Sequence, residues 1–198
     1  MNTLKFPLSL IFKITTLSND FSAIDANGNT VAFVRQKLLR LIEEVQVFKN
    51  ESRSELIYTI RANKWIDFNA TYIFTNKMGI EIGRIVRRGW TSLWKANYEI
   101  FNKNQQQDLV VHEENPWAKV MDSMLGELPI IGMLTGYFFH PSYIVTRSNG
   151  TPVVRLRKEV SFFGRKFTID KLSEFVNDEE ERIVLGLMMM ILLERQRG

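Results

Sequence analysis

The amino-acid sequence predicts a mainly β fold of the α+β kind, an antiparallel closed β-barrel around a hydrophobic C-terminal α-helix. In the first two thirds of the chain, short segments alternate apolar and polar residues between turn residues, which is typical of strands with one buried face. Residues 183–193 carry no polar side chain. A helix that is apolar all round must be buried on every side, and a curled sheet wrapped around it also hides strand edges.

Composition predicts one globular domain spanning residues 1–198, because no proline- or serine-rich linker divides the chain. The 45% hydrophobic and 24% charged residues argue against disorder. The absence of cysteine excludes disulfides and thiolate metal sites and fits a reducing compartment, so we expect a cytoplasmic protein, either free or peripheral to the membrane. A net charge of +4 mildly favours anionic partners. The alternative interpretation is that the extra positive charge only keeps the protein soluble.

The N-terminus admits two interpretations. Residues 6–12 are apolar enough to resemble a short signal segment, but no small-residue cleavage site follows. Leu8, Leu10 and Phe12 alternate with Ser9 and Ile11, which predicts a first strand.

Further strands and turns follow from alternation and turn residues. The expected strand segments are Val45–Val47, Leu56–Ala62, Ala70–Thr75, Ile80–Val86 and Leu93–Phe101, and the expected turns are residues 25–29, 76–79 and 148–150. In the second segment Leu56, Tyr58 and Ile60 share a face.

One segment interrupts the strands. Asn115 can cap a helix and Pro116 suits its first position, so we expect a short helical insertion near residues 116–126. An apolar run, residues 128–139, follows. Core packing is one interpretation of this run. The other is a membrane or partner contact with Trp117, Phe138 and Phe139 as interfacial aromatics.

The C-terminal helix has a clear beginning. Asp178, Glu179, Glu180 and Glu181 stand where the helix dipole favours negative charge. The apolar run that follows spans about 16 Å as a helix. This run is too short for a membrane crossing, which takes about 20 apolar residues. Gly186 in its middle predicts a close approach by a neighbouring strand or side chain.

Three segments carry a resemblance to a known family. They are residues 140–145 (HPSYIV), 149–156 (NGTPVVRL) and 161–169 (SFFGRKFTI), with Gly83–Ile85 and Trp94–Ala96 as middle strands. In this order they resemble LURP-one-related and phospholipid-scramblase-like proteins of the tubby C-terminal-like superfamily. The resemblance implies a barrel around a central helix and a binding or membrane-associated role.

Scramblase-like relatives carry a calcium-linked acidic segment before the helix, and this sequence departs from it. Phe163, Gly164 and Phe167 match, but Glu159 and Ser161 occupy the two aspartate positions. We therefore expect no metal. Residues 25–29 do not form a calcium loop either, because Thr30 stands where such a loop needs glycine.

Catalytic signals are absent from the sequence. None of the phosphate-loop, nucleophile-elbow, dinucleotide or zinc-protease motifs is present, and His112 and His140 are the only histidines. His140 precedes a proline at the start of an expected strand, and Glu113 and Glu114 are adjacent acids that usually point apart. We expect neither an enzyme nor a cofactor.

Basic residues are the stronger functional signal. Arg155 and Arg157 should project from one strand, with Arg165 and Lys166 after the next turn, and Arg84, Arg87 and Arg88 form a second set. If these strands are neighbours, they form a patch suited to phosphate. The alternative is a solvated charged face.

Two functions follow. The favoured one is a module that binds anionic phospholipid headgroups or a membrane surface, and the alternative is a structural or protein-interaction scaffold without a small ligand. A continuous basic surface would support the first, and a surface neutralised by acids would support the second. We expect no nucleic-acid partner, because no such motif is present.

Overall fold

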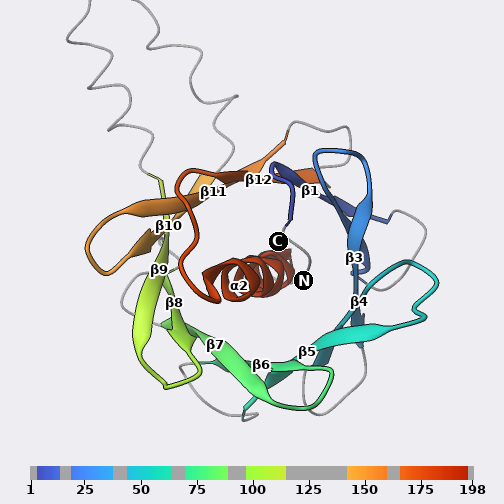
Figure 1. The fold of residues 1–198 in the computed structure, drawn as a ribbon, viewed down its shortest axis with the longest axis horizontal. Coiled ribbons are helices and arrows are strands. Elements are labelled where there is room, and N and C mark those ends of the chain that lie inside the picture. Colours follow the sequence, from blue (N-terminus) through green and yellow to red (C-terminus); the bar gives the residue numbers. More distant parts are fainter. Residues whose placement is uncertain are drawn as a thin grey trace, which may run out of the picture.

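The computed structural model describes residues 4–13, 19–37, 44–63, 70–88, 97–114, 142–159 and 166–195. Within them the chain forms twelve strands and one long helix (Figure 1). The elements are β1 (Leu8–Phe12), β2 (Phe21–Ile24), β3 (Thr30–Lys37), β4 (Glu44–Phe48), β5 (Leu56–Ala62), β6 (Thr71–Asn76), β7 (Glu81–Arg88), β8 (Asn97–Asn102), β9 (Gln107–Glu113), β10 (Ser142–Arg147), β11 (Pro152–Lys158), β12 (Lys166–Lys171) and α2 (Glu179–Arg195).

The strands form a closed antiparallel barrel. Each strand pairs with the next along the chain, and β1 pairs with β12, where Leu8 lies opposite Ile169 and Leu10 opposite Phe167. Closure gives every described strand two neighbours, which removes unpaired edges. The predicted fold class is confirmed.

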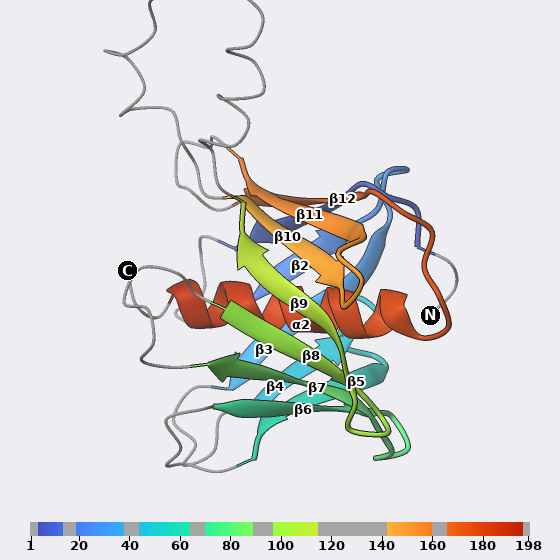
Figure 2. The same ribbon diagram turned by 90° about the vertical axis from the view of Figure 1, so that its left-hand side faces the viewer.

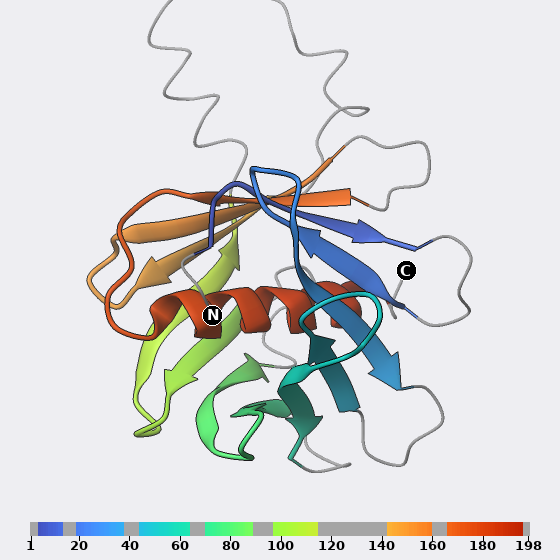
Figure 3. The ribbon, with the colours of Figure 1, turned by 45° about the vertical axis from the view of Figure 1, so that its right-hand side comes forward.

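The helix α2 runs through the barrel and fills its centre (Figures 2 and 3). From Ile183 to Leu193 no side chain is more than 6% exposed, and Gly186 is buried as well. The strands turn alternate residues toward it: Leu8, Leu10 and Phe12 are buried, as the alternation predicts. The helix and the inward-facing strand residues together form the hydrophobic core, because a helix that is apolar on every side is buried only when it is surrounded.

The two ends of the barrel differ. At one end, which we call the turn rim, lie short hairpin turns and the beginning of α2 (Figure 2, right). At the other end, the connection rim, the odd-numbered strands β1 to β11 end, each following strand begins, and α2 ends (Figure 2, left). Most of each connection between these strand ends falls outside the described residues.

The hairpin turns repeat one device. In the predicted 25–29 turn, Asp25 Oδ1 accepts the N–H groups of Asn27 and Asn29, and in the predicted 76–79 turn Asn76 accepts those of Met78 and Ile80. Such side-chain acceptors stabilise turns by replacing backbone partners. Asn50 and Asn102 begin their turns in the same way.

Other predictions fall outside the described residues. These are the helical insertion near 116–126, the apolar run 128–139, and the first part of the expected strand at residues 93–101, whose described part is β8. In the described part of the chain, no helix has both the length and the apolar character needed to cross a membrane.

Candidate functional site

The first predicted basic residues lie on the outer wall of the barrel. Val154 and Leu156 are fully buried beneath, so Arg155 and Arg157 point outward, as predicted. Arg155 Nη2 lies 3.0 Å from Oε1 of Glu114. Arg157 Nε donates to Oδ2 of Asp170 at 2.8 Å.

The second basic set divides between two faces of β7. Arg84 donates from Nε and Nη2 to Oε1 of Glu81, at 2.9 and 2.7 Å, and Arg88 Nε donates to Oε2 of Glu99 at 2.9 Å. Arg87 lies on the opposite face, because it pairs with Tyr98, a buried residue that points toward the helix. The three arginines therefore do not form one surface group.

The two sets are not neighbours. Strands β8, β9 and β10 separate β7 from β11 in the barrel. The hydrogen bonds that Arg88 donates to Glu99 and that Arg157 donates to Asp170 raise the pKa of both arginines. On the described outer wall, the predicted arginines therefore form charge-balanced pairs and not a continuous basic patch.

Two lysines retain an unbalanced charge. Within the described ranges, neither Lys158 nor the exposed Lys166 forms an ion pair, and both lie at the connection rim. Arg165, Trp117, Phe138 and Phe139 lie outside the described residues.

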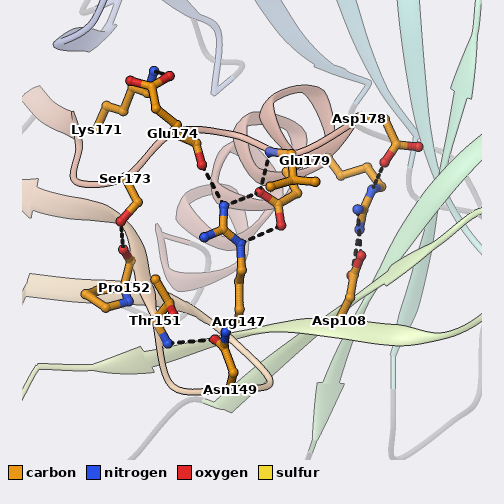
Figure 4. A network of polar contacts seen from close by, with 12 residues as sticks. Asp108, Arg147, Asn149, Thr151, Pro152, Lys171, Ser173, Glu174, Asp178 and Glu179 are labelled. Atoms are coloured by element: carbon orange, nitrogen blue, oxygen red, sulfur yellow. Dashed lines mark hydrogen bonds and ion pairs between the residues drawn. The ribbon is translucent and has the colours of Figure 1, made fainter.

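The strongest polar contacts lie at the turn rim and were not predicted (Figure 4). Arg147, at the end of β10, reaches the first turn of α2, where its Nε and Nη2 donate to the two carboxylate oxygens of Glu179 at 2.8 and 2.7 Å. Its Nη2 also donates to the carbonyl of Glu174. Burial alone would raise the pKa of Glu179, but the hydrogen bonds from Arg147 and the Val176 N–H lower it overall.

A second arginine joins the helix to β9. Arg182 is 2% exposed, and its Nη1 and Nη2 donate to Oδ1 and Oδ2 of Asp108, both at 2.7 Å. Its Nε donates to Asp178 Oδ1 at 3.1 Å. The guanidinium is thus surrounded by carboxylates, which a buried charge requires.

The acidic run therefore does more than complement the helix dipole. Asp178 binds Arg182, Glu179 binds Arg147, Glu180 Oε1 accepts the Leu4 N–H at 3.0 Å, and Glu181 hydrogen-bonds Tyr58. Glu179, Glu180 and Glu181 thus hold α2 to β10, to the segment before β1 and to β5, whereas Asp178 binds an arginine of α2 itself.

The other end of the helix is held more simply. Tyr98 donates its hydroxyl proton to Glu194 at 2.7 Å, and the Arg195 guanidinium lies 4.2 Å from the centre of the Phe12 ring. Nearby, burial and the charges of Glu194 and Glu113 raise the pKa of Tyr143 to about 12. Both ends of α2 are thus fixed by polar contacts.

One sequence signal could have identified Arg147. The other described hairpin turns begin with Asp25, Asn50, Asn76 or Asn102, whereas Arg147 begins the fifth. In that turn Asn149 accepts the Thr151 N–H instead. The first position of the other turns holds a side chain that accepts hydrogen bonds within the turn. An arginine at this position cannot do so, which indicates that its side chain binds a residue far away in the sequence.

The described acidic and histidine side chains are the groups that a metal site would require. Among the described residues, no three or more histidine, aspartate and glutamate side chains are grouped so as to hold a metal ion. His112 lies on β9 opposite Ile144, away from the helix contacts. A scan of protein-family models, a search of curated proteins and a search of solved structures each found no match to this chain.

Proposed function

We propose that this protein is a non-enzymatic interaction scaffold of the cytoplasm, whose rigid barrel presents its outer wall to another protein. The observation that carries the proposal is the charge balance of that wall: Arg84, Arg88, Arg155 and Arg157 each bind a carboxylate of the barrel. Each carboxylate neutralises its guanidinium, so these arginines present little net positive charge to a phosphate group. Charge-balanced surfaces are better suited to selecting a protein partner than to attracting a uniformly anionic surface.

The filled centre of the barrel supports the same proposal. Side chains of Leu187, Met189 and Ile191 occupy the space in which an open barrel would hold an apolar ligand. The recognition surface is therefore the exterior. The polar contacts at both ends of α2 make that exterior preorganised, which lowers the entropy lost on binding.

A second candidate function is association with anionic phospholipid. Lys158 and Lys166 form no ion pair within the described residues, and both lie at the connection rim. The 28 residues between Glu113 and Ser142, which include Trp117, Phe138 and Phe139, join two strand ends at this rim. Long connections often carry function, and interfacial aromatics suit a membrane surface.

Membership of the tubby C-terminal-like superfamily, close to LURP-one-related and scramblase-like proteins, is also a proposal. The barrel around a C-terminal helix supports it. It is compatible with both candidate functions.

Vesicle flotation distinguishes the two functions. The full chain would be mixed with vesicles of phosphatidylcholine, with or without phosphatidylserine, at low and high salt. The scaffold proposal predicts that no protein floats. Salt-sensitive flotation that Lys158→Glu/Lys166→Glu abolishes and Arg155→Glu/Arg157→Glu preserves would favour the lipid function.

Cross-linking in cells provides the positive test. A lysine-reactive reagent should join this chain to a partner protein through Lys13 or Lys166 on the outer wall, and the partner should be recovered in stoichiometric amount. Lys103, in a turn at the other rim, is the internal control. Absence of any cross-linked partner, together with flotation, would overturn the scaffold proposal.

A further inference from the structure

A row of outward side chains crosses adjacent strands of the barrel wall. Direct register partners place Lys166 beside Ile11, Ile11 beside Ser22, Ser22 beside Phe33, and Phe33 beside Phe48. Direct partners point to the same side of a sheet, so these side chains form one stripe. Ile11 remains 39% exposed, whereas Phe33 is only 4% exposed although it points away from the barrel centre.

The turn after β4 covers the middle of this row. Glu51, in that turn, accepts a hydrogen bond from the Ser22 hydroxyl at 2.7 Å and from Lys13 Nζ at 2.7 Å. Lys13 Nζ also lies 5.0 Å from the centre of the Phe33 ring. The hydrogen bonds from Lys13 and Ser22 lower the pKa of Glu51, so the carboxylate is ionised at neutral pH.

The arrangement is a small carboxylate-binding site. It contains a hydroxyl donor that is 5% exposed, an ammonium group and an aromatic ring beneath them. In this structure the Glu51 side chain occupies the site. The contact is weakly held, because the Lys13 and Glu51 side chains are 35% and 50% exposed and such surface pairs contribute little.

We propose that Ser22, Lys13 and Phe33 form a docking site for an acidic, apolar segment of a partner protein, and that Glu51 occupies this site in the unbound protein. A glutamate of the partner replaces Glu51 on Ser22 and Lys13, and a neighbouring aliphatic side chain packs on the exposed Ile11, while the buried Phe33 ring contacts the Lys13 ammonium group. Lys166, next to Ile11, favours a second acid on the same segment. This inference rests on the proposed scaffold function and names the surface and the partner chemistry.

The experiment uses the full chain and a short fluorescein-labelled peptide of alternating glutamate and leucine, with fluorescence anisotropy as the readout. Glu51→Gln should bind the peptide roughly five-fold more tightly than the wild type, because the internal competitor is weakened. Glu55→Gln is the matched control: Glu55 follows the same turn but pairs with Lys49 and Lys77, so this variant should bind as the wild type does. Adding Lys13→Ala or Ser22→Ala to Glu51→Gln should abolish the gain.

Hydrogen exchange gives a second measurement. The amides of residues 49–55 should exchange faster in Glu51→Gln than in Glu55→Gln. Equal exchange and equal peptide affinity in the two variants would overturn the inference, as would tight binding that survives Lys13→Ala. If the peptide fails to bind but cells still yield a cross-linked partner, the docking site is wrong and the scaffold function stands.

Discussion

Arg182 of α2 and Asp108 of β9 form a two-pronged ion pair, with Nη1–Oδ1 and Nη2–Oδ2 both at 2.7 Å. The residues are 74 positions apart, and Arg182 is 2% exposed. Parallel hydrogen bonds of this kind set orientation as well as distance. The pair therefore constrains how far α2 enters the barrel and how it is rotated, together with the other polar contacts at both ends of the helix.

Removing one partner of this pair should be costly. Asp108→Ala should lower the free energy of unfolding by about 3 kcal/mol, because it leaves a buried guanidinium with fewer acceptors. Urea denaturation measures the change. Lys77→Ala, at the exposed pair with Glu55, should cost well under about 1 kcal/mol. The double variant Arg182→Met/Asp108→Asn should recover most of the loss, and equal losses in the single and double variants would contradict this account.

The two buried glycines should respond differently to alanine. A Cβ at Gly186 would lie 2.9 Å from Cδ1 of Ile100, whereas one at Gly83 would lie 2.6 Å from the Phe101 carbonyl oxygen. A side-chain end can shift more easily than a backbone carbonyl. Gly186→Ala should therefore cost about 1 kcal/mol, the strain exceeding the gain in helix propensity, and Gly83→Ala about 3 kcal/mol.

Thermal unfolding checks both glycine variants. Ile100→Val should relieve Gly186→Ala, so that the double variant loses less than the sum of the single changes. Additive losses would show that the strain lies elsewhere.

The helix is the core of the fold and should tolerate no charge at its centre. Met189→Asp should cost several kcal/mol, comparable to total stability, because Met189 is 0% exposed. Deleting residues 178–198 should leave an insoluble or molten chain. A truncated protein that stays soluble and melts sharply would show that the barrel stands without its filling. Met78→Asp, at a residue 71% exposed, is the matched control and should change little.

Acid should weaken the attachment of α2. The folded-state pKa of Glu179 lies below the ordinary value of 4.5, so its stabilising contribution is complete above pH 4.5 and is lost as pH falls through the folded value. The melting temperature of the wild type should therefore fall more steeply below pH 4.5 than that of Glu179→Gln. Parallel pH profiles for the two proteins would show that Glu179 titrates normally. At neutral pH, Glu179→Gln should already be the less stable protein.

Calcium should leave the stability unchanged. The aspartate positions of the scramblase-like segment hold Glu159 and Ser161, which provide a weaker set of ligands. Calorimetry with calcium and with a chelator should give the same melting temperature. A rise of several degrees with calcium would show that this segment binds the ion.

The sequence alone determined most of the strands, three of the five described hairpin turns and the buried helix, because each of these follows from a local pattern, but it did not predict β2, β3 or β9. Tyr58 and Ile60 alternate within one strand and residues 183–193 lack any polar side chain, so their burial could be predicted without knowing their neighbours. Leu56, expected on the same face as Tyr58, is only partly buried, because the register of β4 and β5 shifts between Val47 and Phe48. The outward direction of Arg155 and Arg157 followed from the same periodicity.

The tertiary structure decided which charges meet. Glu114 and Arg155 are 41 positions apart, and Arg147 and Glu179 are 32 apart. Strand order and register bring them together, and a shift of one residue would turn every side chain to the other face. The same reason explains Arg87, which the sequence grouped with Arg84 and Arg88 but which lies on the opposite face. Local periodicity determines to which face of a strand a charged side chain points. Only the strand order and register of the closed barrel determine which residue lies beside it.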